Sequence, residues 1–90
     1  MNTMLQPSPP KRTFTYEQTV KYEVARDLLN TRRAELSEQI ELEEAKALPD
    51  ASVIAQLESR LLDIAAEIRD LDVTDEAGLD ASIAKNRREP

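Results

Sequence analysis

Carboxylates are the residues of this 90-residue chain that come closest to the pattern of a chemical site. They crowd into two stretches of helix-forming residues: Glu35, Glu38, Glu41, Glu43, Glu44, Glu58, Asp63, Glu67 and Asp70. Helical bundles bind pairs of metal ions through inward glutamates combined with Glu-x-x-His motifs. The chain has no histidine, and the positions expected to face inward are aliphatic. We therefore expect these carboxylates to face solvent and to bind neither a metal nor a cofactor.

Other catalytic chemistries lack their essential residue types. The absence of cysteine rules out a disulfide framework, a thiolate zinc site and a cysteine nucleophile. Without histidine, no serine can be activated by the usual base, so triad chemistry is excluded as well. Gly78 is the single glycine, so no glycine-rich loop can cradle a phosphate. The sequence therefore predicts a protein that is not an enzyme, with no catalytic residues.

A heptad repeat in the second half of the chain gives the strongest structural signal. Its members follow one another at spacings of 3, 4, 3, 4 and 3 residues: Ile54, Leu57, Leu61, Ile64, Ile68 and Leu71. This spacing places them on one narrow stripe of a helix. A matching stripe in the first half consists of Ala25, Leu29, Leu36, Ile40 and Ala47. The two stripes predict an all-α fold, an antiparallel two-helix coiled-coil hairpin.

Capping residues and prolines place the boundaries of this hairpin, which we expect over residues 14–72. Thr15 and Gln18 have the spacing of a capping box, so the first helix is expected over 15–47. Pro49 disfavours helix at the residue before it, which predicts a turn at 48–50. Asp50 is a suitable N-cap for a helix over 51–72.

Both ends of the chain are expected to lie outside the hairpin. Residues 1–13 contain three prolines and predict a disordered, Pro-rich tail. Residues 73–90 are expected to form a polar connector, a weak third helix over about 76–86 and a charged tail. Thr74 and Asp75 are alternative caps for that short helix.

Two polar residues interrupt the stripe of the first helix, Arg33 and Glu43. We expect Arg33 to extend its charge into solvent at the rim of the helix pair. The alternative is a contact that fixes the register of the two helices, in which Arg33 reaches Asp63 or Glu67.

A second apolar face on the first helix is the predicted interaction site. Its members are spaced four residues apart: Tyr16, Val20, Val24 and Leu28. One shorter helix cannot bury both this face and the first stripe. Either the C-terminal segment folds back to cover it, or a second protein does. Because a bare hairpin buries little apolar surface, we favour a two-fold homodimer that forms a four-helix bundle; a helix from another protein is the alternative partner.

Charge and hydropathy narrow the class of partner. The net charge is −6, and residues 34–80 carry 14 acidic and three basic side chains. Nucleic acid is therefore a poor partner, although the basic ends leave a role as a nucleic-acid-associated accessory protein open. An acidic inhibitor that mimics nucleic acid and binds a basic protein is the main alternative function. Neither a membrane-spanning segment nor the apolar core of a signal peptide is apparent, so we expect a cytoplasmic protein-protein interaction module, such as an adaptor or co-chaperone.

Overall fold

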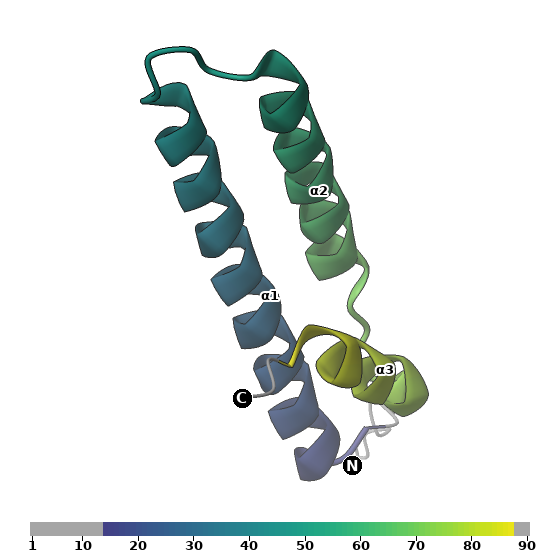
Figure 1. The fold of residues 1–90 in the computed structure, drawn as a ribbon. Coiled ribbons are helices and arrows are strands. Elements are labelled where there is room, and N and C mark those ends of the chain that lie inside the picture. Colours follow the sequence, from purple (N-terminus) through teal and green to yellow (C-terminus); the bar gives the residue numbers. More distant parts are fainter. Residues whose placement is uncertain (1–13, 88–90) are drawn as a thin grey trace, which may run out of the picture.

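The protein is all-helical over the residues that the structure describes. The computed structural model describes residues 14–87, which contain three helices and no strand. They are α1 (Tyr16–Glu44), α2 (Ala51–Asp70) and α3 (Glu76–Asn86). Figure 1 shows α1 and α2 running antiparallel side by side, with α3 lying across the first half of α1. The Pro-rich tail expected at 1–13 and the last residues, 88–90, lie outside the described part of the chain.

Each helix begins at a side chain that caps its free amides. The Thr15 hydroxyl accepts a hydrogen bond from the Gln18 amide at 3.1 Å, and the Gln18 side chain accepts the Thr15 amide at 2.9 Å, as the predicted capping box requires. Asp50 accepts the amides of Ser52 and Val53, which confirms it as the N-cap of α2. For α3, Asp75 fills the cap and Thr74 does not.

The connection between α1 and α2 is longer than predicted because Glu43 turns toward it. The helix ends at Glu44 rather than residue 47. The Glu43 carboxylate accepts the Asp50 amide at 3.0 Å and pairs with Lys46 at 2.9 Å. These two contacts of Glu43 hold the turn of residues 45–50 at the end of the α1–α2 pair. The expectation that Glu43 faces solvent is wrong, since only 9% of its surface is exposed.

This turn makes stability depend on pH through Glu43. The hydrogen bond from Lys46, and then the one from the Asp50 amide, lowers the pKa of Glu43 below its ordinary value. Because the pKa of Glu43 is lower in the folded protein than in the unfolded chain, its ionised carboxylate stabilises the fold. This contribution is fully present above the pKa that Glu43 has in the unfolded chain. That stability is lost as the pH falls through the lower, folded value.

We expect Glu43→Gln to melt at a lower temperature than the natural chain at about pH 7, because the charged contact is lost. The gap should narrow as the pH falls from about 7 through the lowered pKa of Glu43, because the carboxyl is then neutral as well. Melting curves followed by circular dichroism over this range measure it. A gap that is unchanged across the range would show that the charge of Glu43 does not hold the turn.

The packed residues of the α1–α2 pair are those of the heptad stripes. Leu29 has no exposed surface and Leu57 has 9%. Seven other members are half-buried: Leu36, Ile40, Ile54, Leu61, Ile64, Ile68 and Leu71. The prediction that Ala47 belongs to the stripe is wrong, since this residue is exposed and lies beyond the end of α1. Partial burial is the expected result when only two helices meet along a line, because nothing covers the outer edges of the stripe. Arg33 is exposed and donates to Asn30 at 2.8 Å, so it does not reach Asp63 or Glu67.

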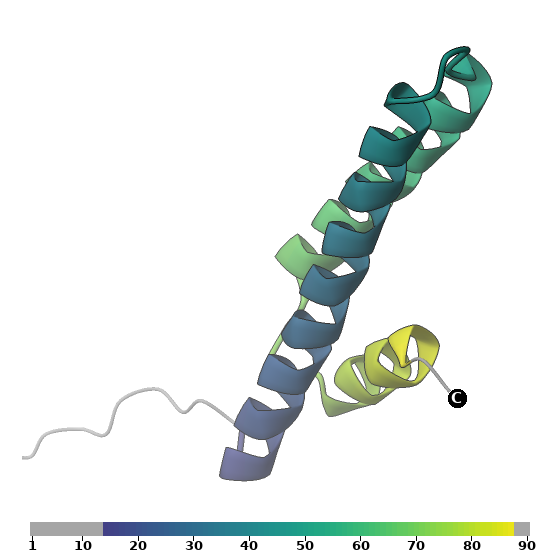
Figure 2. The same ribbon diagram turned by 60° about the vertical axis from the view of Figure 1, so that its left-hand side comes forward.

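The C-terminal segment folds back onto the first half of α1. Figure 2 shows α3 against one side of α1, below the end of α2. Leu79 of α3 and Ala25 of α1 are each 1% exposed, and they join Leu29 as the most buried residues of the structure's described part. Three of the four buried apolar residues in the described part therefore lie on α1 and α3, and the fourth, Leu57, lies on α2.

Candidate protein-interaction site

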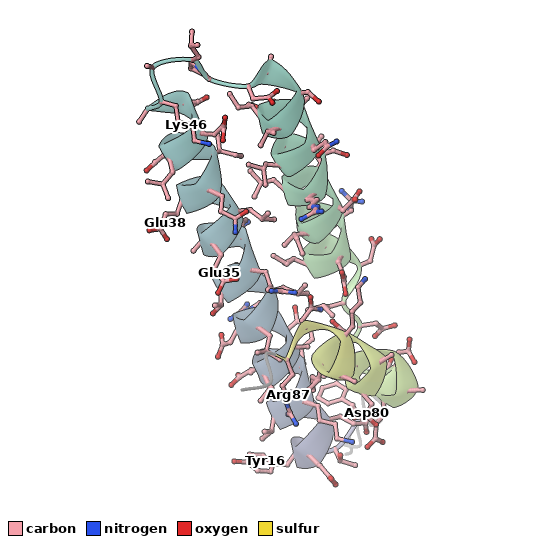
Figure 3. All side chains as sticks on the ribbon, in the orientation of Figure 1. Tyr16, Glu35, Glu38, Lys46, Asp80 and Arg87 are labelled. Atoms are coloured by element: carbon pink, nitrogen blue, oxygen red, sulfur yellow. The ribbon has the colours of Figure 1, made fainter. Side chains whose placement is uncertain are left out.

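The predicted interaction face stays largely uncovered even though α3 has packed on α1. Tyr16 is 84% exposed, Val20 41% and Val24 37%, whereas Leu28 is half-buried. Figure 3 shows the Tyr16 side chain pointing away from both α2 and α3. We name Tyr16, Val20 and Val24 the valine face. The C-terminal segment does fold back onto α1, but it leaves the valine face uncovered.

Helix geometry explains the gradient of exposure along this face. Residues four apart on an α-helix are offset by about 40°, so a series at this spacing winds slowly around the helix. Tyr16 lies on the side of α1 opposite the buried Ala25. Each following member turns toward the core, until Leu28 reaches its edge. The exposed part of the series thus spans about 12 Å of the helix, from Tyr16 to Val24.

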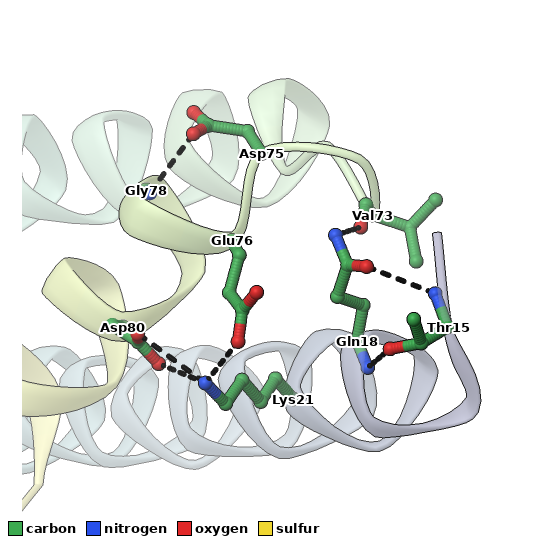
Figure 4. A network of polar contacts seen from close by, with 8 residues as sticks. All are labelled: Thr15, Gln18, Lys21, Val73, Asp75, Glu76, Gly78 and Asp80. Carbon is green, nitrogen blue, oxygen red and sulfur yellow. Dashed lines mark hydrogen bonds and ion pairs between the residues drawn. The ribbon is translucent and has the colours of Figure 1, made fainter. Parts of the chain in front are cut away.

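Polar contacts at the N-terminal end of α1 hold α3 on the neighbouring side. Lys21 binds Glu76 at 2.6 Å and Asp80 at 3.0 Å, and the Gln18 side chain donates to the Val73 carbonyl at 3.4 Å (Figure 4). The hydrogen bonds to Glu76 first and Asp80 second raise the pKa of Lys21 above its ordinary value. The ammonium of Lys21 therefore stays charged, and its contacts fix α3 beside the valine face rather than on it.

A second polar cluster ties α3 to the end of α2. The Glu67 carboxylate accepts hydrogen bonds from Ser82 at 3.1 Å and Asn86 at 3.4 Å, and it pairs with Lys85 at 3.2 Å. Ser82 and Asn86 are 7% and 3% exposed, and Asn86 also donates to the Ser82 carbonyl at 2.9 Å, so Glu67 completes a network of buried polar groups. The expectation that Glu67 faces solvent is wrong, since the residue is half-buried. No local pattern could reveal this role, because the partners lie on another helix.

One groove runs beside this cluster, but its lining does not define a ligand. It measures about 340 Å³ and has Leu36 and Ile64 among its apolar lining residues. Its charged residues are three cations and three anions: Arg32, Arg60, Lys85, Glu35, Asp63 and Glu67. Two of the cations are already paired, Arg32 with Glu35 at 3.6 Å and Lys85 with Glu67. With balanced charge and paired side chains, the groove selects neither an anion nor a cation.

Neither a metal-binding cluster nor a membrane-spanning helix is found among the described residues. Within residues 14–87, no group of three or more histidine, cysteine, aspartate or glutamate side chains is placed to hold a metal ion. None of the helices in this range combines the length and apolar character that spanning a bilayer requires. The valine face is the candidate site in this part of the chain because its apolar side chains are exposed side by side on one helix.

Comparison with known proteins adds no relative from which a function could be transferred. No family model matches the chain, and no curated protein or solved structure matches it either.

Proposed function

We propose that this protein is a non-catalytic protein-protein interaction module whose partner binds the valine face of α1. The observation that carries the proposal is the exposure of Tyr16, Val20 and Val24 next to a well-buried core. Contiguous exposed apolar surface on a small protein marks an interaction site more often than scattered single residues do. The other large apolar side chains that are exposed within residues 14–87 lie on three different segments, namely the end of α1, the turn and α2: Leu42, Leu48 and Leu62.

The scaffold that presents this face is proposed to pack as a coiled coil. The heptad spacing of the α2 stripe supports knobs-into-holes packing between α1 and α2. Two chains that met through their valine faces would form a four-helix bundle. This homodimer is one possible use of the site, and the binding of a different protein is the other.

Exposed carboxylates favour a second candidate function, an acidic inhibitor that binds a basic protein. Glu44 on α1 and Glu58 and Asp63 on α2 are all exposed. An inhibitor of this kind would bind through charge, so its affinity would fall steeply with salt and would not depend on the valine face.

Site-specific photo-crosslinking in the cells that make the protein tests the proposed function. A photoreactive amino acid at Val20 should yield discrete adducts with one partner, whereas the same residue at Leu62 on α2 should not. Adding Val24→Asp should remove the Val20 adducts while circular dichroism stays unchanged. The same adducts from both positions, or none from Val20, would contradict the proposal.

A further inference from the structure

Four charged residues of α1 lie three positions from Val20 or Val24; three of them are carboxylates, and the fourth is Lys21. By the rotation of the helix, Glu17, Glu23 and Asp27 lie on the same side of α1 as Tyr16, Val20 and Val24. All three are exposed. The face is therefore an apolar strip bordered by carboxylates along the first three turns of α1.

These three carboxylates have no partner within the described part of the chain. Over residues 14–87, the side chains of Glu17, Glu23 and Asp27 make neither an ion pair nor a hydrogen bond. Carboxylates at the contacts between helices are paired, since Glu76 binds Lys21 and Glu67 binds Lys85. Those beside the valine face are unpaired, as are exposed carboxylates on other surfaces such as Glu44 and Glu58; what distinguishes the former is their position next to exposed apolar side chains.

The cations that lie nearest on α1 are directed elsewhere. Lys21 is held by Glu76 and Asp80 of α3. The Arg26 guanidinium lies over the Tyr22 ring, 5.9 Å from its centroid. By the helix rotation, Tyr22 and Arg26 are on the flank of α1 away from Val20 and Val24. Both cations thus make their direct contacts outside the valine face.

We propose that the valine face binds a basic amphipathic helix of another protein. The inference depends on the proposed function and specifies its partner. An aliphatic stripe of the partner helix contacts Tyr16, Val20 and Val24, so that the partner helix packs lengthwise against α1. Lysine or arginine residues beside that stripe pair with Glu17, Glu23 and Asp27. A second copy of this chain fits less well, because its interface would bring together two sets of the same unpaired carboxylates.

Two synthetic helical peptides with the same leucine stripe test this partner class. One carries lysines beside the stripe and the other carries glutamates. Calorimetric titration of the full chain should give binding to the lysine peptide that is about tenfold tighter, the sum expected for a few exposed ion pairs. Raising the salt concentration should reduce this difference, because exposed charges are screened.

Charge reversal on the protein provides the decisive variant. Glu17→Lys, Glu23→Lys and Asp27→Lys together should invert the preference, so that the glutamate peptide binds more tightly. The control has the same change of net charge at exposed positions elsewhere: Glu44→Lys, Glu58→Lys and Asp63→Lys. It should keep the preference for the lysine peptide. Circular dichroism of both triple variants establishes that each is folded.

Each other outcome overturns the inference in a distinguishable way. If both peptides bind equally and Val24→Asp abolishes both, the partner is not selected by charge, although the proposed function stands. If the control reverses the preference as well, the lysine peptide binds the general acidic surface. If neither peptide binds, or if light scattering shows a dimer that Val24→Asp dissociates, the basic helix is not the occupant. The proposed function itself fails if the Val20 crosslinks are absent or if the same adducts arise from Leu62.

Discussion

Leu29→Asp is expected to unfold the protein. Leu29 lies on α1, has no exposed surface and belongs to the apolar core. An ionised carboxylate at this position would be buried without a partner, which costs several kcal/mol in the free energy of folding. Small domains are stable by only about 5–15 kcal/mol, and this one has little core to spare. Circular dichroism at about 25 °C should show most of the helical signal lost.

Val24→Asp is the matched control, since it makes a similar apolar-to-charged change one turn of α1 earlier. Val24 is 37% exposed, so the new carboxylate can remain in water. We expect nearly full helicity and a melting temperature within a few degrees of the natural chain. If Val24→Asp unfolds a monomeric protein as Leu29→Asp does, the valine face belongs to the core. If Leu29→Asp melts like the natural chain, the core has been placed wrongly.

Leu79→Ala is expected to release α3 from α1. Leu79 is 1% exposed, and truncating a buried leucine costs about 2–5 kcal/mol. The contacts that remain, chiefly those of Lys21 and Glu67, join exposed or half-buried side chains that stabilise little. Hydrogen exchange should therefore show the amides of α3 losing protection by about 30-fold or more, while those in the middle of α2 lose less.

Leu62→Ala is the control for this variant, because it removes the same atoms from a side chain that is 72% exposed. Its exchange pattern should match that of the natural chain. Protection of α3 that survives Leu79→Ala would show that the polar contacts, and not the buried leucine, hold the helix in place.

Local signals in the sequence predicted the helices well. The capping box at Thr15 and the N-cap at Asp50 are both present, because caps depend on residues within one turn of each other. The 3-4 spacing in α2 predicted which side is turned inward, since burial follows the helical period. The end of α1 was placed three residues too late because Glu43 bonds the Asp50 amide, a contact across the turn that has no helical period.

The position of α3 could not be predicted from local sequence signals. Its two branched aliphatic residues, Leu79 and Ile83, showed that one side of α3 is apolar. They did not show which side of α1 this apolar side would cover. That choice depends on Lys21 pairing with Glu76 and on Glu67 pairing with Ser82, residues far apart in the sequence. The four-residue spacing of the valine face is visible in the sequence, whereas its exposure depends on where α3 packs.

The exposure of the valine face in the isolated chain is the claim on which the functional proposal depends. Solvent paramagnetic relaxation of methyl groups, measured by NMR on the full chain at a concentration where it is monomeric, tests this claim most directly. We predict strong relaxation for Val20 and Val24 and weak relaxation for the buried methyls of Leu29 and Leu79. Relaxation of Val20 and Val24 as weak as that of Leu79 would mean that another segment of the same chain covers the face, which would contradict its role as a binding site.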